Sequence, residues 1–452
     1  MLRRKLLLSG VVLSALLCSS LVPLAGASMI WSRTYGGTGD DVANSLIATS
    51  DGGYALAGST FSFGSGEYQQ VSGGIPENFW LVKTDAVGNM LWNQTYGGTG
   101  PDWANSLVAT SDGGYALVGI WNYSEYPQTN GRSPYQADVW LVKTDTLGNM
   151  EWNRTYGGPG NDWATSLVAT VDGGYAFAGY TNLDGNEMEF TDAWLVKTDA
   201  FGNIEWNRTY DQGPYDSFSS LVTTLDGGYA LTGNEFWLVK TDALGNMEWN
   251  QTYGENTGPR SAHALVGTPD GGYAIAGIRE WGNSGYKNIQ YSSVSWLFKT
   301  NSSGGLEWDR TIGEIPASLN TAWSLVATTD RGYVMAGDPL VKINSNGFVD
   351  WSDSYRETRN MARSVVQTAD GGYIIAGTAN SDADFWLAKT DALGFSPGFP
   401  PTPGLSPTPT SSSWFIPLLL ATATSIALVA VLLFIFKRKR VPHKRSLQQA
   451  DV

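Results

Sequence analysis

The sequence of 452 residues contains one cysteine and two histidines, and both scarcities limit its chemistry. The cysteine, Cys18, lies in an apolar N-terminal stretch, so the rest of the chain has no thiol for a disulfide bond or a nucleophile. Outside the C-terminal tail the only histidine is His263. A histidine-based metal site and a Ser-His-Asp triad therefore lack the residues that they need. The chain also has no Walker-type phosphate loop.

Charged residues are few as well, at 15%, and acidic ones outnumber basic ones. Without the basic residues of the two termini and without Asp451, 19 basic and 41 acidic residues remain, a net charge near −22. A nucleic-acid partner would need the opposite sign, so none is expected. The abundant residues are glycine, with 54, and tryptophan, with 19. Such a composition is typical of an all-β protein with glycine-rich turns.

The two ends of the chain predict export and membrane anchoring. Residues 1–27 have a basic start, an apolar stretch and small residues at their end, as in a signal peptide; an uncleaved anchor is the alternative. Residues 414–436 begin with Trp414 and continue without a charge, long enough for a transmembrane helix. Residues 396–413 form a Pro/Ser/Thr-rich stalk, and residues 437–452 form a basic cytoplasmic tail.

These segments predict a single-pass protein of the cell membrane, with residues 28–395 outside the cell and the C-terminus in the cytoplasm. Exported domains in disulfide-forming compartments usually contain cysteines. A cysteine-free exported domain therefore favours a prokaryotic surface.

Seven copies of one unit fill residues 28–395. Each copy contains four predicted strands, which in the second copy are residues 106–110, 115–119, 140–144 and 150–156. An Asp-Gly-Gly turn joins the first two strands, and Asp-Gly is a strong hairpin signal. The turn aspartates are Asp51, Asp112, Asp172, Asp226, Asp270, Asp330 and Asp370.

The strand count predicts a closed ring. A fourth-strand motif at Trp31 precedes the first unit, whereas the last unit stops at its third strand, at Trp386. The N-terminal strand can therefore complete the seventh sheet, which makes an all-β, seven-bladed β-propeller. The alternative is an open solenoid of the same units. The sixth unit, with Arg331 in its turn and Pro339 in place of tryptophan, is expected to be the least regular.

The motifs Asp-Gly-Gly-Tyr and Trp-Leu-Val-Lys-Thr-Asp-x-x-Gly-Asn resemble the propeller repeats of archaeal and bacterial secreted proteins, over roughly residues 29–395. The resemblance implies a propeller on an archaeal or bacterial surface, here anchored in the membrane. It implies little about activity, because a fold does not determine a function.

One face of such a ring is expected to carry the ligand. The connections from second to third strand vary between 1 and 21 residues and lie on the same face, whereas the other face has tight turns. The long loops are rich in aromatic residues, among them Trp121 and Trp281. These rings could stack on sugars or anchor a protein. The alternative is that they only pack together to order the loops.

A second candidate site is the entrance to the innermost strands. Carboxylates and aromatic faces there fit a carbohydrate or a cation such as Ca²⁺, although no cofactor is required. Alternatively, each aspartate hydrogen-bonds the backbone of its own glycine-rich loop. His263 replaces the residue that corresponds to Asn105 and is expected to be a hydrogen-bonded structural residue. The candidate site residues are Asp41, Asp102, Asp162, Asp216, Trp103 and Trp163.

Six Asn-x-Ser/Thr sequons predict a glycoprotein. Four of them lie in fourth strands, whose alternation places the asparagine on the outer rim, although repetition of the motif would also produce them. The sequons begin at Asn93, Asn122, Asn153, Asn207, Asn250 and Asn301.

The function that this sequence favours is recognition or adhesion at the cell surface, with carbohydrate or protein as the partner and no catalytic residue. One alternative is a glycan-processing enzyme, because glycosidases need only a pair of carboxylates. The turn motif Thr-Asp-x-x-Gly-Asn is similar to the tryptophan docking motif of quinoprotein dehydrogenases, but those proteins commonly have eight blades. The last alternative is a structural spacer of the cell envelope.

Overall fold

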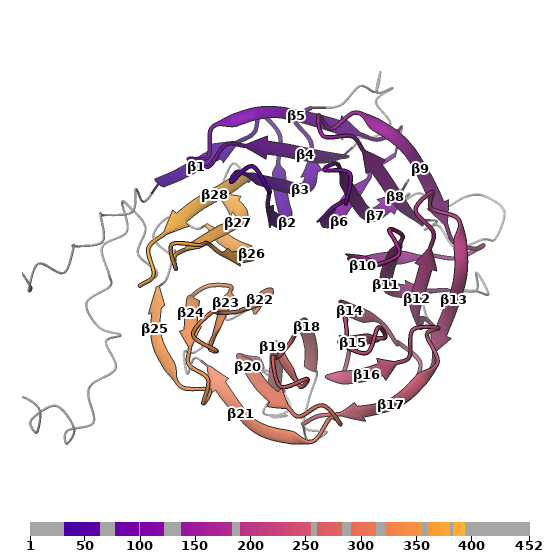
Figure 1. Cartoon of the computed structure of the whole chain (residues 1–452), viewed down its shortest axis with the longest axis vertical. Helices are drawn as coiled ribbons and strands as arrows, with labels where there is room; N and C mark the ends of the chain where they lie inside the picture. Colours follow the sequence, from indigo (N-terminus) through magenta and orange to yellow (C-terminus); the bar gives the residue numbers. More distant parts are fainter. Residues whose placement is uncertain are drawn as a thin grey trace, which may run out of the picture. The chain divides into compact units, whose positions relative to one another are not determined.

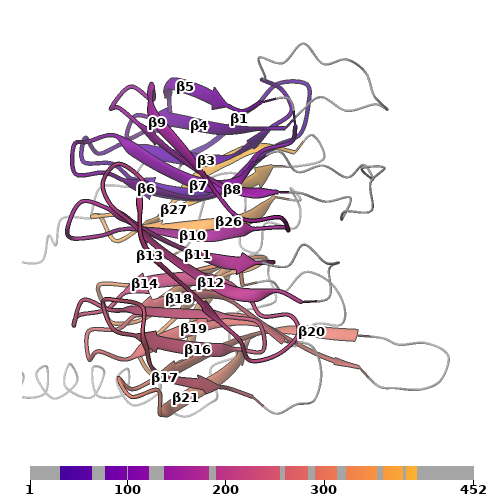
Figure 2. The same cartoon turned by 90° about the vertical axis from the view of Figure 1, so that its right-hand side faces the viewer.

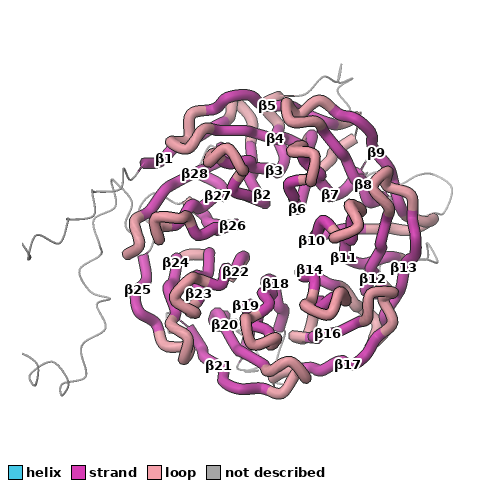
Figure 3. Tube along the Cα trace, viewed as in Figure 1, coloured by secondary structure: helices cyan, strands magenta, loops and turns pink. Residues whose placement is uncertain are grey.

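The computed structural model describes residues 31–63, 77–98, 100–121, 137–182, 190–254, 260–282, 291–312, 322–353, 360–379 and 383–393. These residues form seven four-stranded antiparallel sheets, which surround one axis as the blades of a propeller (Figure 1). The predicted seven-bladed β-propeller is therefore confirmed. Every regular element in these ranges is a strand (Figure 3).

Each blade is a meander whose strands follow one another from the axis to the rim (Figure 1). Blades one and two contain β2 (Asp41–Ala48), β3 (Tyr54–Thr60), β4 (Asn78–Thr84), β5 (Met90–Tyr96), β6 (Trp103–Ala109), β7 (Tyr115–Trp121), β8 (Asp138–Thr144) and β9 (Met150–Tyr156). Blades three and four contain β10 (Trp163–Ala169), β11 (Tyr175–Thr181), β12 (Asp192–Thr198), β13 (Ile204–Tyr210), β14 (Phe218–Thr223), β15 (Tyr229–Gly233), β16 (Trp237–Thr241) and β17 (Met247–Thr252).

The remaining three blades follow the same order. Blades five and six contain β18 (Arg260–Gly267), β19 (Tyr273–Gly282), β20 (Tyr291–Thr300), β21 (Leu306–Ile312), β22 (Ser324–Ala327), β23 (Tyr333–Ala336), β24 (Leu340–Ile343) and β25 (Val349–Asp353). Blade seven contains β26 (Met361–Gln367), β27 (Tyr373–Ala379), β28 (Asp384–Thr390) and, as its outermost strand, β1 (Trp31–Tyr35). Three strands of blade six have only four residues, which confirms its predicted irregularity.

The N-terminal strand closes the ring. β1 pairs antiparallel with β28, and Thr34 stands opposite Trp386 (Figure 1). The indole Nε1 of Trp386 donates a hydrogen bond to Ser32 Oγ at 2.9 Å. The predicted closure is therefore confirmed, and the open solenoid is excluded.

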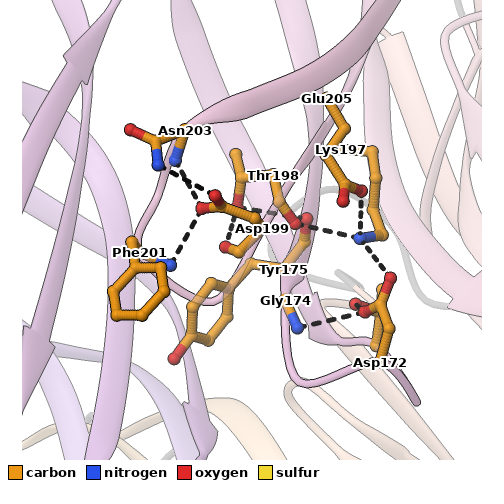
Figure 4. A network of polar contacts seen from close by, with 10 residues as sticks. Asp172, Gly174, Tyr175, Lys197, Thr198, Asp199, Phe201, Asn203 and Glu205 are labelled. Atoms are coloured by element: carbon orange, nitrogen blue, oxygen red, sulfur yellow. Dashed lines mark hydrogen bonds and ion pairs between the residues drawn. The ribbon is translucent and has the colours of Figure 1, made fainter.

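The Asp-Gly-Gly turn requires both glycines for different reasons. In blade three, Gly173 has φ +85°, which L-residues with a side chain rarely adopt. Gly174 has no such angle, but a Cβ there would lie 2.1 Å from the carbonyl oxygen of Thr198. Asp172 secures the turn because its Oδ1 accepts a hydrogen bond from the N–H of Gly174 at 3.0 Å (Figure 4).

A buried lysine beside each turn is neutralised by carboxylates. Lys197 Nζ donates to Asp172 Oδ2 and to Glu205 Oε2, both at 2.7 Å (Figure 4). The corresponding lysine of each of the other six blades is buried and ion-paired with its turn aspartate: Lys83, Lys143, Lys240, Lys299, Lys342 and Lys389.

Apolar side chains fill the seven interfaces between neighbouring blades. Between blades one and two, for example, Phe79 packs on Trp140 with ring centroids 4.8 Å apart. At the rim, a Cβ on Gly88 of blade one would lie 2.5 Å from the indole of Trp31, and Tyr35 donates its hydroxyl proton to the carbonyl of Gly88 at 2.7 Å. The same outer contacts recur around the ring, as with Tyr96 and Gly148.

Near the axis, a β-bulge in most innermost strands supplies a polar link to the next blade. In β2 the register shifts between Ala43 and Ser45, so that Asn44 is the extra residue. Asn44 Nδ2 donates to the carbonyl of Ala104 at 2.9 Å, and Ser45 Oγ accepts from the N–H of Leu107 at 3.2 Å.

The strands run so that all tight turns lie on one face of the disc, the turn face, and all second-to-third connections on the other, the looped face. Figure 2 shows the disc from the side, with β20 extending beyond it on the looped face. This division matches the predicted one, but residues 64–76, 122–136, 183–189 and 283–290 of the long loops lie outside the described residues.

The predicted signal peptide, stalk, transmembrane helix and tail also lie outside the described residues. The chain divides into two compact units, Met1–Thr402 and Pro403–Val452, and the propeller belongs to the first. In the part of the chain that the structure describes, no helix has the length and apolar character to cross a membrane.

Candidate functional site

The four predicted aspartates lie at the junctions between blades on the looped face. Their side chains are buried: those of Asp41, Asp102 and Asp162 are fully inaccessible, and that of Asp216 is 8% exposed. The backbone N–H of each donates to a carbonyl at the start of the preceding blade's third strand, as Asp102 does to Glu77 at 2.7 Å.

Each of these carboxylates accepts a hydrogen bond from the backbone of the loop before it. The donors are the N–H groups of Gly37, Gly98, Gly158 and Gly213, at 2.7 to 3.0 Å. The carboxylate of Asp41 also accepts hydrogen bonds from the hydroxyl groups of Thr60 and Ser62. The interpretation that the aspartates order their own loops is thus confirmed, and ligand binding by them stays a prediction.

At two of these junctions a neighbouring carboxylate contributes to a raised pKa. Burial raises the pKa of Asp162, and the charge of Asp138 adds to this effect. Burial also raises the pKa of Glu77 to about 7, and Asp40 and Asp102 add like charge. Sequence reasoning missed Glu77, because the other blades have different residues at this position.

The structure brings the predicted Trp103 and Trp163 together. Both are the first residues of innermost strands, both are partly exposed, and their rings stack at 6.0 Å with an interplanar angle of 30°. Tyr180, opposite Trp163 in the neighbouring strand, extends this surface with ring centroids 5.7 Å apart. We call these three residues the aromatic platform. Tyr180 was missed, although a tyrosine after the second-strand glycine occurs only in this blade.

The other two predicted tryptophans are not part of this platform. Trp121 ends β7 and packs on the buried Trp140 with ring centroids 4.5 Å apart. Phe63 packs in the same way on Trp80, at 5.2 Å. The loop aromatics therefore contact third-strand tryptophans at the points where the loops begin. Trp281 pairs with Ser292 through its backbone, and its side chain lies outside the described residues.

The predicted glycosylation sites that can be located are exposed. Asn93, Asn153, Asn207 and Asn250 lie on outermost strands, and Asn301 lies in a turn. Three of the rim asparagines accept a hydrogen bond from a tryptophan of the adjacent strand, as Asn153 does from Trp140 at 3.2 Å. Asn122 lies outside the described residues. Exposure permits glycosylation, which stays a prediction.

Two further features bear on the site. Within the described residues, no group of three or more His, Cys, Asp or Glu side chains could hold a metal ion. A hollow of about 610 Å³ lies on the turn face between blades four and five, lined among others by Leu225, Pro269 and Tyr273. None of the predicted site residues lines it.

No protein-family model matches the chain, and a search of curated protein sequences found no match. Similar solved structures include the Pan2 WD40 domain of Neurospora crassa, with 9% identity over 79% of this chain and 91% of that chain, at a TM-score of 0.49. BamB from Moraxella catarrhalis has 10% identity over 80% of this chain and 99% of that chain, at a TM-score of 0.45. A protein of unknown function from Bacteroides caccae has 12% identity over 64% of this chain and 93% of that chain, at a TM-score of 0.40. These values support no argument about function.

Proposed function

We propose that this protein is a membrane-anchored recognition module of a prokaryotic cell surface that binds carbohydrate through its looped face. The observation that carries this proposal is the aromatic platform of Trp103, Trp163 and Tyr180, which is partly exposed at the inner end of that face. Flat aromatic rings stack on the apolar faces of sugars. The platform rests on rigid strands, so little ordering is needed when a ligand binds.

The rest of the proposed arrangement follows the predicted segments. The signal peptide exports the chain, residues 414–436 anchor it in the membrane, and the Pro/Ser/Thr-rich stalk carries the propeller outside the cell. Glycans on the exposed rim asparagines would leave the looped face free, because those residues lie on the outermost strands.

A protein partner is the second candidate, and the long hairpin of blade five favours it. β19 and β20 pair with each other as far as Gly282 and Tyr291, whereas β18 pairs with β19 only as far as Arg279 and β21 pairs with β20 only as far as Ser295. Within the described residues, the end of this hairpin has no neighbouring strand. Such open backbone edges can accept a strand from another protein.

A glycan array tests the carbohydrate proposal. The full-length chain, purified in mild detergent, is compared with Trp163→Ala, which removes the middle ring of the platform. We expect at least tenfold weaker binding of the recognised glycans, as for loss of a central aromatic contact. Phe201→Ala is the matched control because Phe201 is 67% exposed in a turn on the opposite face.

Equal glycan binding by the wild type and Trp163→Ala would refute the platform as the site. If no glycan binds, pull-downs with the full-length chain are compared with a variant whose hairpin tip, residues 280–292, is replaced by Asn-Gly. A protein that is retained by the wild type and lost with the shortened hairpin would favour the second candidate.

A further inference from the structure

One aligned position at the innermost strands carries a small polar side chain in four blades and a larger side chain in the other three. In blades one to four the residue aligned with Asn44 is short and polar: Asn44, Asn105, Thr165 and Ser219. In blades five to seven it is His263, Trp323 and Arg363. The innermost strands surround the axis (Figure 1), and β18, β22 and β26 of blades five to seven are neighbours there.

The three side chains contact one another in order. The ring of His263 stacks on Trp323 at 5.0 Å with an interplanar angle of 11°, and Cζ of Arg363 lies 5.7 Å from the centroid of the Trp323 ring. Arg363 Nη1 then donates to Asn44 Oδ1 at 3.0 Å, so the contacts continue into blade one. We call Asn44, His263, Trp323 and Arg363 the axial cluster.

His263 is held in place and carries no charge. Its Nδ1 lies 3.0 Å from the carbonyl of Ala322, which corresponds to the bond from Asn105 to Ala164 three blades earlier. The predicted structural role of His263 is therefore confirmed. Burial lowers the pKa of His263, so the ring is neutral at pH 7. Arg363 is the one charged member of the axial cluster.

The charge of Arg363 lacks the compensation that this protein gives its buried lysines. All seven third-strand lysines are paired with carboxylates, and Arg260 is paired with Glu235. In the described part of the chain Arg363 has no ion pair, and its buried Nε has no hydrogen-bond partner. Burial lowers its pKa without any contribution from an acidic group. A buried, unpaired cation is costly, and an anion beside it would offset that cost.

The surroundings allow a ligand to reach this charge. Trp323, directly before the innermost strand β22, is 37% exposed, and Arg363 is partly exposed. A guanidinium has five N–H donors, of which Asn44 uses one. The remaining donors and the exposed indole together suit a planar oxyanion.

We propose that the axial cluster binds the oxyanion group of a small ligand, such as a carboxylate, sulfate or phosphate, with Arg363 as the anion-binding residue and Trp323 as an apolar wall. The site lies on strands of blades five to seven and one, apart from the aromatic platform of blades two and three. It does not depend on the carbohydrate function proposed above.

The test is isothermal titration calorimetry with the full-length protein in mild detergent. Sodium sulfate, phosphate, acetate, D-galacturonate and D-galactose are titrated at constant ionic strength, because salt screens charge interactions. We expect at least one of the oxyanions to bind and neutral galactose to bind at least tenfold more weakly than galacturonate. Tighter binding of galacturonate than of acetate would assign the ligand to sugar acids, and tighter binding of sulfate or phosphate would assign it to inorganic or ester oxyanions.

Arg363→Asn is the principal variant, because asparagine is the residue of blades one and two at this position and fits the bulge. We expect at least tenfold weaker oxyanion binding. Arg154→Asn is the matched control, because this substitution removes the same charge. Arg154 also lies over a tryptophan ring, at 5.7 Å, but is exposed on the rim.

Arg363→Lys keeps the charge and the apolar stem and serves if the asparagine variant does not fold. It should bind at least threefold more weakly than wild type, because lysine lacks the planar fork. The proposal is overturned if no oxyanion binds at 50 mM or if the Arg363 variants bind as tightly as Arg154→Asn.

Discussion

Single aspartates on the turn face are held in their charged form. Burial opposes the charge of Asp172, but hydrogen bonds from Lys197 and Thr170 outweigh it and lower the pKa of Asp172 to about 2. The ordinary value is 3.8, so this side chain stabilises the fold fully above about pH 4. That contribution is lost as the pH falls towards 2.

Glu77 on the looped face responds to pH in the opposite direction. Its pKa is about 7 in the folded protein and 4.5 ordinarily, so folding is favoured below pH 4.5 and loses this advantage as the pH rises through 7. We expect Glu77→Gln to raise the free energy of unfolding at pH 8 by on the order of 1 to 3 kcal/mol. The gain should become small at pH 5. Urea unfolding followed by tryptophan fluorescence at both pH values measures it.

Asp172→Asn is the control for this comparison. It should destabilise the protein at pH 7 by about 1 kcal/mol, a modest value because the side chain is half exposed, and the difference should disappear near pH 2. A gain for Glu77→Gln that is the same at pH 5 and pH 8 would contradict the role assigned to its ionisation.

The residues that sequence reasoning located best are those that repeat. The turn aspartates and glycines recur in nearly every unit, so their turn could be predicted from one copy. Glu77, Tyr180 and Arg363 each occur in one blade only, and their neighbours come from other blades. Arg363, for example, bonds to Asn44, which lies 319 residues away along the chain. No local pattern reports such a contact.

At the scale of the strands and turns, blade six tests what the Asp-Gly-Gly turn requires. Arg331 replaces the first glycine and has φ +66°, a left-handed conformation that costs a residue with a side chain about 1 to 2 kcal/mol. We expect Arg331→Gly to stabilise the protein by about 0.5 kcal/mol, because the greater freedom of glycine in the unfolded chain offsets part of the gain. Thermal unfolding measures the change.

The reciprocal substitution, Gly173→Arg, should destabilise the protein by about 1 kcal/mol. A Cβ at Gly173 meets nothing within 4 Å, so only the backbone conformation opposes it. If both substitutions changed stability in the same direction, an effect other than the left-handed conformation would govern this position.

Strands and tight turns were predictable because periodic patterns and turn residues encode them directly. The bulges of the innermost strands were not. Asn44 and Ser45 differ little from residues of a regular strand, and the register shift becomes visible only in the pairing with β3. The candidate site shows the same limit: the sequence placed Trp103 and Trp163 at equivalent positions, but their stacking depends on the angle between two blades.

For the whole molecule, closure depends on contacts made by one five-residue strand. β1 pairs with β28 of blade seven, and its Trp31 and Tyr35 also contact Gly88 of blade one. It therefore joins the last blade to the first with the same outer contacts that connect all other neighbours. The strand count predicted this arrangement because it left one strand over at the N-terminus and one missing at the end.

We call the contacts of β1 with β28 and with blade one the closing seam. Trp31→Ala tests whether the closing seam holds the ring together. The Trp31 side chain is 6% exposed, and its removal should lower the free energy of unfolding by about 3 to 5 kcal/mol. Trp92→Ala is the matched control, because Trp92 has the same position in blade one and packs on Gly148 at an internal seam. Hydrogen exchange of the full-length protein locates the change, since protection reports local opening.

In the Trp31 variant we expect faster exchange in β1, β28 and β2, on both sides of the closing seam. In the Trp92 variant β5 remains covalently connected to β4 of its own blade and to β6 of the next, so the loss of protection should stay near β5 and β8. At the closing seam residues 36–40 connect β1 to β2 in the same way, but no turn connects β28 to β1, which are held together by strand pairing and side-chain contacts alone. A Trp31 variant whose faster exchange is confined to β1, with β28 and β2 as protected as in wild type, would show that the ring does not need this strand for closure.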